Sequence, residues 1–144
     1  MTQGAINAGN AAEPLGNYPH ARRAGGLLFL SGIGPRTRGS KEIPGATVND
    51  RGELVSYDIE AEMRSCFENV RRVLAEAGSA WEKIIDVQVF LTDMKRDWPT
   101  YNRVYAEFFP PGPNQPTRTT VEVAALPTGG NTPIHVEVKI VAGV

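Results

Sequence analysis

The chain has 144 residues, and on a prior of about 150 residues per domain this length predicts one domain spanning residues 1–144. With 41% apolar and 22% charged residues, the composition is that of a globular protein and excludes an intrinsically disordered chain. Fifteen basic and 16 acidic residues leave a formal charge of -1, so the sequence has no electrostatic signature of a protein that binds nucleic acid or an anionic membrane surface.

Cysteine and histidine are scarce. The single cysteine, Cys66, excludes an intrachain disulfide and fits a reducing cytoplasm. Together with His20 and His135 it provides too few ligands for a closed Cys/His zinc site within one chain, so no such cofactor is expected. Residues 1–18 lack the basic and apolar regions of a signal peptide, and no stretch approaches the roughly 20 apolar residues of a membrane span. We therefore expect a cytoplasmic protein.

The first third of the chain predicts a hairpin and then a long surface loop. The apolar run LLFL at 27–30 is bounded by glycines and predicts a buried strand, with residues 19–24 as its hairpin partner. Residues 36–54 are polar and rich in turn-forming residues, which predicts a surface excursion with room for one short strand. Such an excursion is a place where substrate specificity can be set.

The strongest helical pattern begins at Asp58. Apolar residues then recur at intervals of three to four positions as far as Ala77, and Gly78 supplies a C-terminal stop. Ser79 and Glu82 match a capping box for one short helical turn. We expect the long helix to pack on a sheet.

The second half of the chain predicts three strands and one helix. Residues 85–92 alternate as a strand, and Asp97 is placed to cap a helix with Pro99 in its first turn. Residues 118–124 and 134–141 alternate as two late strands. In the strand predicted at 85–92, the face expected to be apolar consists of Ile85, Val87, Val89 and Leu91. The apolar stripe of the helix consists of Trp98, Tyr101, Tyr105 and Phe108.

These elements predict an α+β fold, a mixed sheet of about six strands with two helices packed on one face. The other face then needs a partner, so we expect an oligomer. The residues that alternation assigns to that open face are Arg118, Thr120, Glu122, His135, Glu137 and Lys139. Because they are polar, they predict a wet functional cleft.

Arg118 and Glu137 each allow two interpretations. A half-buried arginine needs an anion, which is either a bound carboxylate or an internal partner such as Glu122 or Glu137. Glu137 is either that structural partner or a general acid/base whose pKa is raised by partial burial. For His20 and His135, structural hydrogen bonding is favoured over catalysis.

Several segments in fixed order carry a family resemblance. They are GNYPHA, FLSG, FENVRRVLAEAG, VFLTDM, YNRVYAEFF, PTRTTVEVAALP and VEVKIVA. From Tyr18 onward the chain resembles the Rid (YjgF-type) family of enamine/imine deaminases. The resemblance implies a chorismate-mutase-like fold, no cofactor, and a homotrimer with active sites between subunits, with a hexamer of two trimers as the alternative.

The resemblance also implies roles for individual residues. Arg118 matches the arginine that holds the substrate carboxylate, and Glu137 matches the glutamate that positions or activates water. Matched positions that line the family's cleft are Tyr18, Ser31, Gly32, Asn102 and Thr120. Thr120 stands where many members have cysteine. A register shift of two after Leu126 would put His135 at the water position instead, but we prefer Glu137 because VEVKIVA ends like the family strand.

Within the family the segments SGIGPR, DMKRDWPTYNR and RTTVEVAALP are most similar to the 2-aminomuconate deaminases. The implied reaction hydrolyses 2-aminomuconate, a dicarboxylate, to 4-oxalocrotonate and ammonia in bacterial aromatic catabolism, with backbone N–H groups near Ser31 and Gly32, or Arg118, stabilising developing charge. The alternatives are a general 2-aminoacrylate deaminase and a non-catalytic protein that binds small carboxylates. Candidate cations for the second carboxylate are His20, Arg22, Arg23, Lys139 and the basic residues of 36–54.

Overall fold

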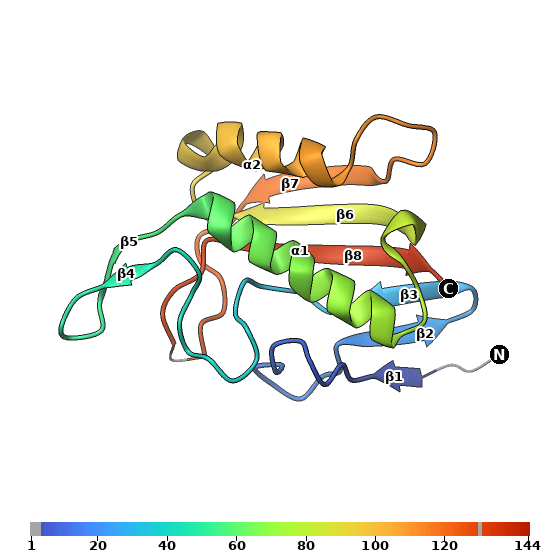
Figure 1. Cartoon of the computed structure of the whole chain (residues 1–144), viewed down its shortest axis with the longest axis horizontal. Coiled ribbons are helices and arrows are strands. Elements are labelled where there is room, and N and C mark those ends of the chain that lie inside the picture. Colours follow the sequence, from blue (N-terminus) through green and yellow to red (C-terminus); the bar gives the residue numbers. More distant parts are fainter. Residues whose placement is uncertain (1–3, 130) are drawn as a thin grey trace.

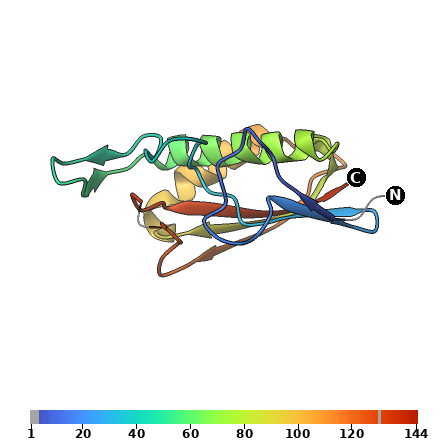
Figure 2. The ribbon, with the colours of Figure 1, turned by 90° about the horizontal axis from the view of Figure 1, so that it is seen from below.

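Six strands form one mixed sheet in the order β1-β2-β3-β8-β6-β7 in the computed structural model, which describes residues 4–129 and 131–144. The strands are β1 (Gly4–Ile6), β2 (Ala21–Ala24), β3 (Leu27–Leu30), β6 (Ile84–Leu91), β7 (Thr117–Glu122) and β8 (Val136–Gly143). Neighbouring strands are antiparallel except β6 and β7. Helices α1 (Ile59–Glu76) and α2 (Met94–Phe108) cover one face and leave the other bare (Figure 1; Figure 2). The predicted α+β fold class is confirmed.

The core lies between the helices and the side of the sheet that faces them. The buried residues that β6 and β8 contribute on that side are Ile84, Val87, Val89, Leu91, Val136, Val138, Ile140 and Ala142. The buried apolar residues of α1 are Ile59, Met63, Cys66, Phe67, Val70, Val73 and Leu74. Burying one such side chain contributes about 1.5–3 kcal/mol, so this layer holds α1 on the sheet.

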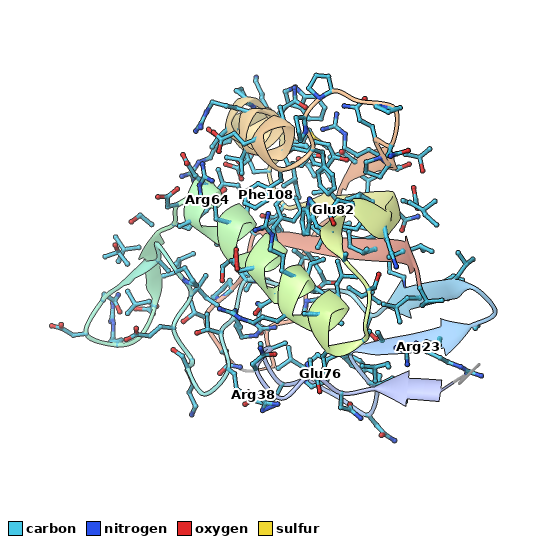
Figure 3. All side chains as sticks on the ribbon, turned by 45° about the vertical axis from the view of Figure 1, so that its right-hand side comes forward. Arg23, Arg38, Arg64, Glu76, Glu82 and Phe108 are labelled. Carbon is cyan, nitrogen blue, oxygen red and sulfur yellow. The ribbon has the colours of Figure 1, made fainter. Side chains whose placement is uncertain are left out.

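The contact between α1 and α2 is aromatic and is edged by arginine. The rings of Phe67 and Phe108 lie 4.8 Å apart between centroids. The Arg64 guanidinium lies 5.9 Å from the Phe108 centroid, where the two helices meet (Figure 3). Cation–π contact of this kind covers the apolar rings without removing the charge from water.

Asp58 and Gly78 delimit α1, as the sequence predicts. The Asp58 carboxylate accepts the N–H groups of Glu60 and Ala61 at 3.0 and 3.3 Å and so satisfies donors that lack a partner within the helix. Gly78 follows the helix at φ 75°, a left-handed conformation that glycine adopts without steric cost.

The start of α2 differs from the prediction. Its N-cap is Asp93, whose carboxylate accepts the N–H of Arg96 at 3.1 Å. Asp97 lies inside the first turn and is buried, where it accepts a hydrogen bond from the Tyr57 hydroxyl at 2.8 Å. The predicted capping role of Asp97 is wrong because its carboxylate is committed to Tyr57, and Pro99 consequently lies beyond the first turn.

The hairpin of β2 and β3 is confirmed, but the burial of β3 differs from the prediction. Leu28 and Leu30 are buried, whereas Leu27 and Phe29 are 37% and 40% exposed. The helices cover only one face of the sheet, so a strand in it buries alternate residues. The exposed pair adds apolar area to the bare face.

The segment before and at the start of β6 also departs from expectation. A register shift near Ile84 puts that residue in the core and leaves Ile85 48% exposed, so Ile85 does not share a face with the buried residues of the strand. The turn Trp81–Lys83 forms without a side-chain cap. Ser79 and Glu82 do not form the predicted capping box, because the Ser79 hydroxyl donates to a β8 carbonyl at 2.6 Å.

The faces of β7 are the reverse of those predicted. Arg118 pairs with Val87 and Thr120 with Val89 of β6, and both valines are fully buried beneath the helices. Arg118 and Thr120 therefore point to the helix side. Glu137 alternates with the buried residues of β8 and points to the open face. The prediction that all three share the open face is wrong, because the parallel register with β6 decides the faces of β7.

The predicted excursion at 36–54 contains one short strand and ends where a second one begins. β4 (Thr47–Val48) and β5 (Leu54–Ser56) form a separate ribbon that projects from one end of the molecule (Figure 2). Gly130 lies outside the described residues. Across the described chain, the helices are too short or too polar to span a bilayer.

Candidate functional site

The residues selected by resemblance fall into two groups, with one residue apart. The group around a cavity consists of Tyr18, Ser31, Gly32 and Glu137. The group between α2 and β7 consists of Asn102, Arg118 and Thr120. His135 lies apart from both groups and bonds to Glu62 of α1.

The cavity has a volume of about 370 Å³ and lies where the end of β3, the following turn, β8 and the loop before β2 meet. Pockets for small organic ligands span about 300–1,000 Å³. The polar lining residues are Glu13, Tyr18, His20, Ser31, Arg36, Asn69, Glu137 and Lys139. Within residues 4–129 and 131–144, no three His, Cys, Asp or Glu side chains are grouped to hold a metal ion.

Glu137 presents its carboxylate to this cavity. No hydrogen bond from a described residue contributes to its environment; burial raises its pKa, and the charge of Arg36 opposes part of the rise. A carboxylate with a raised pKa is a better proton acceptor than an exposed one. The chemistry available to Glu137 is therefore that of a general base acting on water.

Gly32 is in close contact with Glu137. A Cβ added to Gly32 would lie 2.9 Å from Glu137 Cδ, so the carboxylate occupies the space that a side chain would need. The neighbouring Ser31 has no donor left for a ligand, because its N–H donates to the His20 carbonyl at 2.9 Å and its hydroxyl to the Pro19 carbonyl at 2.7 Å. Of the two backbone amides expected to stabilise charge, only that of Gly32 lacks a backbone partner in the described chain.

Tyr18 and His20 border the cavity from the loop before β2. Tyr18 is 45% exposed, and its hydroxyl accepts the N–H of Leu15 at 3.3 Å. His20 is buried; Nδ1 accepts the N–H of Ala8 at 2.9 Å, and Nε2 lies 2.7 Å from the carbonyl of Ala12. One nitrogen accepts and the other donates, so the ring is neutral and supplies no cation to a ligand.

The Arg118 guanidinium lies among three aromatic rings. Its Cζ is 4.6, 5.3 and 5.4 Å from the centroids of Tyr105, Tyr101 and Trp98. Its Nη1 donates to Asn102 Oδ1 at 2.9 Å. Rings and a neutral amide hold the guanidinium in place without neutralising its charge.

Arg118 makes no salt bridge within the described residues. Of the two carboxylates considered as partners, Glu122 accepts the N–H of Met94 at 2.8 Å, and Glu137 points to the other face of the sheet. The buried hydroxyl of Tyr105 also lacks a hydrogen-bond partner among the described residues. Burial raises the pKa of Tyr105 to about 12, although the charge of Arg118 opposes the rise. This region therefore has guanidinium and hydroxyl donors that fit a carboxylate from outside the chain.

The two groups of residues lie on opposite sides of one sheet. Thr120, whose hydroxyl is 2.6 Å from that of Tyr101, shares the helix side with Arg118. Glu137 is on the open face. A small ligand does not reach through a hydrogen-bonded sheet, so a site that uses both Arg118 and Glu137 has to draw them from two chains.

His135 precedes β8 and lies outside the cavity lining. Its N–H donates to Glu62 Oε1 at 2.8 Å, and its Nδ1 lies 2.8 Å from Glu62 Oε2. The ring stacks on Tyr57, with centroids 3.5 Å apart. In this register of the last strand it is Glu137, and not His135, that lines the cavity.

Sequence reasoning missed individual roles for Arg36 and Glu62. Arg36 was grouped only with the excursion, yet it lines the cavity, and its Nη1 is buried without a partner among the described residues. Its position directly after the segment SGIGP was the available signal. Glu62 occupies an apolar position of α1, three residues after Ile59, and a charged residue there signals a buried polar partner.

Comparison with known proteins gives consistent matches along the chain. A family model described as Endoribonuclease L-PSP matches residues 8–144. A RutC family protein of Pyrococcus horikoshii is 38% identical over 121 residues, which cover 82% of each chain. Reactive Intermediate Deaminase A, chloroplastic, of Arabidopsis thaliana is 30% identical over 132 residues, which cover 92% of this chain and 62% of the relative.

Solved structures share the same architecture. The crystal structure of E. coli TdcF with bound serine has 30% sequence identity and a TM-score of 0.78, and the match covers 97% of this chain and 98% of that one. Similarity at this coverage includes both helices and the six-stranded sheet, so the chorismate-mutase-like fold is confirmed.

Proposed function

The chain belongs to the Rid (YjgF-type) family, and from this premise we propose that it is a deaminase that hydrolyses 2-aminomuconate to 4-oxalocrotonate and ammonia. The proposal depends on one observation above all: the Glu137 carboxylate lies in a cavity of suitable size and has no hydrogen-bond partner among the described residues. The name of the Arabidopsis relative, Reactive Intermediate Deaminase A, supports the reaction class. The serine bound by TdcF supports a small ligand of amino-acid type.

In the proposed reaction the enamine first tautomerises to the 2-imine. Glu137 takes a proton from water as the water oxygen bonds to C2, and returns that proton to the nitrogen, which gives a tetrahedral carbinolamine. The C2–N bond then breaks, the hydroxyl proton passes to nitrogen through Glu137, and ammonia leaves as the carbonyl forms. Imine and water thus become ketone and ammonia without an oxidant or reductant.

In this proposal Arg118 of a neighbouring copy holds the C1 carboxylate, because the Arg118 of the same chain faces the other side of the sheet. A contact that joins two different surfaces of each copy is head-to-tail, and it forms a closed ring when the rotation between successive copies closes. The bare sheet face, with Leu27, Phe29 and Val121 between 37% and 41% exposed, provides apolar area for that contact. We propose a homotrimer with intersubunit sites, and a hexamer of two trimers as the alternative.

Positioning accounts for most of the proposed rate gain. An imine carbon is already electrophilic, so a water held against it by Glu137 reacts at high effective concentration. The Arg118 fork and the N–H of Gly32 are the groups available to stabilise negative charge as it develops. No metal or other cofactor takes part in this proposal.

Ammonia release from freshly generated 2-aminomuconate, measured beside release from 2-aminoacrylate, tests the proposal. We expect kcat/KM for 2-aminomuconate to exceed that for 2-aminoacrylate by about 100-fold, since a site built for a second carboxylate discriminates against a ligand that lacks it. Equal, weak rates on both substrates would instead indicate a general imine deaminase. Binding without ammonia release would indicate a protein that only binds small carboxylates.

RNA is the necessary control substrate, because the description of the matching family model names an endoribonuclease. With a formal charge of -1 and no basic excess, we expect RNA to remain intact under the conditions that release ammonia. Cleavage of RNA that survives repeated purification and that depends on Glu137 would contradict the proposed function.

A further inference from the structure

We infer that Arg36 is the anchor for the second carboxylate of the substrate, inside the cavity that holds Glu137. The inference rests on the proposed function, because only a dicarboxylate substrate needs such an anchor. It selects one residue from the cations that sequence reasoning left open. The selection follows from what each of these side chains already contacts in the fold.

The candidates near β2 are already committed or lie elsewhere. His20 is a neutral ring with both nitrogens in hydrogen bonds. Arg23 donates to the carbonyl of Ala77 at the end of α1 and faces the helix side. Arg22 pairs with Phe29 in the sheet, and neither arginine lines the cavity.

The basic residues of the excursion beyond Arg36 are also engaged or distant. Arg38 pairs with Glu13 at 3.3 Å. Arg51 pairs with Glu53 at 2.9 Å on the projecting ribbon and is 83% exposed. Lys41 lines a different pocket, formed mainly by the chain that leads into β4. None of the three is a lining residue of the cavity around Glu137.

Lys139 lines the cavity but has a partner. Its ammonium group donates to the carbonyl of Leu30, which ties it to the end of β3. Burial lowers the pKa of Lys139, so part of its positive charge is lost more readily than that of an exposed lysine. Lys139 still adds positive potential beside Glu137. Its ammonium group is held at the end of β3, however, and is not free to move to a ligand.

Arg36 differs from the other candidates in having donors to spare. Its Nη1 is buried without a partner among the described residues, and its Nη2 makes only a long contact of 3.4 Å to the Pro127 carbonyl. Its backbone is held firmly, since Asn69 donates to the carbonyls of Gly34 and Arg36 at 3.0 and 2.6 Å. Arg36 thus has a firmly held backbone and a guanidinium with unused hydrogen-bonding capacity.

The electrostatics of the cavity favour an anion at Arg36. A partly buried guanidinium without a hydrogen-bonded anion carries a desolvation cost that a bound carboxylate offsets. Burial lowers the pKa of Arg36 and the charge of Glu137 opposes that effect, but an arginine remains protonated at neutral pH. Arg36 and Glu137 are close enough to influence each other, so a ligand held by Arg36 has its other atoms beside the proposed base.

Binding of two stable six-carbon dienoic acids tests the inference. Muconate has a carboxylate at each end, and sorbate has one carboxylate and a methyl group. By titration calorimetry with the assembled protein, we expect Arg36→Gln to weaken muconate binding about 10- to 100-fold and sorbate binding by less than about threefold. Arg36→Lys keeps the charge and should retain part of the preference for muconate. Arg51→Gln, which removes an exposed charge, is the matched control and should change neither affinity.

Equal weakening of both ligands by Arg36→Gln, with an unchanged Tm, would overturn the inference, and so would a wild-type protein that prefers sorbate. Because neither acid is a substrate, the readout does not depend on turnover. Selective loss of muconate binding in a protein that releases no ammonia from 2-aminomuconate would support the Arg36 anchor and refute the proposed function. If Arg36→Gln does not fold, the muconate-to-sorbate affinity ratio of Arg36→Lys decides the question.

Discussion

A single glycine determines where the Glu137 carboxylate lies. Any side chain at position 32 would meet that carboxyl group, while the neighbouring Ser31 is bonded to the β2 side of the hairpin. Glu137 itself is approached by the charge of Arg36 and by no hydrogen-bond donor of the described chain. At this scale the candidate site consists of one base, one permissive glycine and nearby cations.

Gly32→Ala should lower kcat/KM about 10- to 100-fold, because the added methyl displaces the carboxyl group from the reacting carbon. The displaced atoms are the far end of a flexible side chain, so the Tm should stay within about 2 °C of the wild-type value. Ammonia-release kinetics and a thermal melt check both expectations. Full activity in Gly32→Ala would mean that the exact place of Glu137 does not matter.

Glu137→Gln should lower kcat about 10²- to 10⁴-fold, the usual contribution of a general base. In the wild-type protein the rate should fall as pH decreases through the raised pKa of Glu137, because only the ionised carboxylate accepts a proton. The pH profile of kcat/KM measures this acidic limb. The limb should be absent from the residual activity of Glu137→Gln.

The same substitution should stabilise the protein at neutral pH. Because the pKa of Glu137 is raised in the folded state, the folded chain binds this proton more tightly than the unfolded chain does. The resulting stabilisation is complete at a pH below the unfolded-state pKa. It is lost as the pH rises through the folded-state pKa. At pH 7 Glu137→Gln removes the cost of the buried charge. We expect a Tm higher by about 2 °C at pH 7 and no gain at pH 4.

At the scale of the elements, a polar cluster of Tyr57, Glu62, Asp97 and His135 joins α1 and α2 to the start of β8 on the helix side of the sheet. The sequence alone did not predict this cluster. Glu62 of α1 binds both the N–H and the ring of His135, whose ring stacks on Tyr57. Tyr57 donates to Asp97 of α2, so the cluster ties both helices to the chain entering β8. It fixes where β8 begins and therefore which residue of that strand faces the cavity.

Glu62→Ala should destabilise the fold by about 3 kcal/mol, because it removes a fully buried carboxylate and leaves the half-buried N–H and ring of His135 without their acceptor. Chemical denaturation measures this loss. Glu60→Ala, on the same helix, breaks only surface ion pairs with Arg64 and Arg103 and should cost much less. Similar losses in the two variants would show that the cluster does not hold β8.

On the scale of the whole molecule, the decisive feature is that Arg118 and Glu137 face opposite sides of the sheet. The helices occupy one side and the other is bare (Figure 2). The proposed active site therefore depends on assembly, and a monomer should bind weakly and turn over little.

Mixing two inactive variants tests whether sites are shared between copies. Arg118→Ala and Glu137→Gln should each be nearly inactive, yet co-refolding them at equal concentration should restore about one quarter of wild-type activity, the fraction of shared sites that receive both intact residues. A refolded mixture of Arg118→Ala with the double variant is the control and should remain inactive. No recovery in mixed oligomers would contradict sites between subunits.

Prediction from sequence succeeded where a short stretch of chain carries the information. The long helix with Asp58 and Gly78 at its ends, the β2–β3 hairpin and the six-stranded sheet were all predicted. It failed where two patterns compete locally, as at Asp93 and Asp97, since both are suitable caps and only the position of Tyr57 distinguishes them.

The order of elements, their types and the family were thus contained in the sequence, because periodicity and motif spacing are local properties of the chain. The sides to which Arg118 and Glu137 point, and the gathering of Arg36, Gly32 and Glu137 around one cavity, came only from the folded chain. Strand register is set by packing between segments that are far apart in sequence, and shifting it by one residue turns every side chain of a strand to the other face.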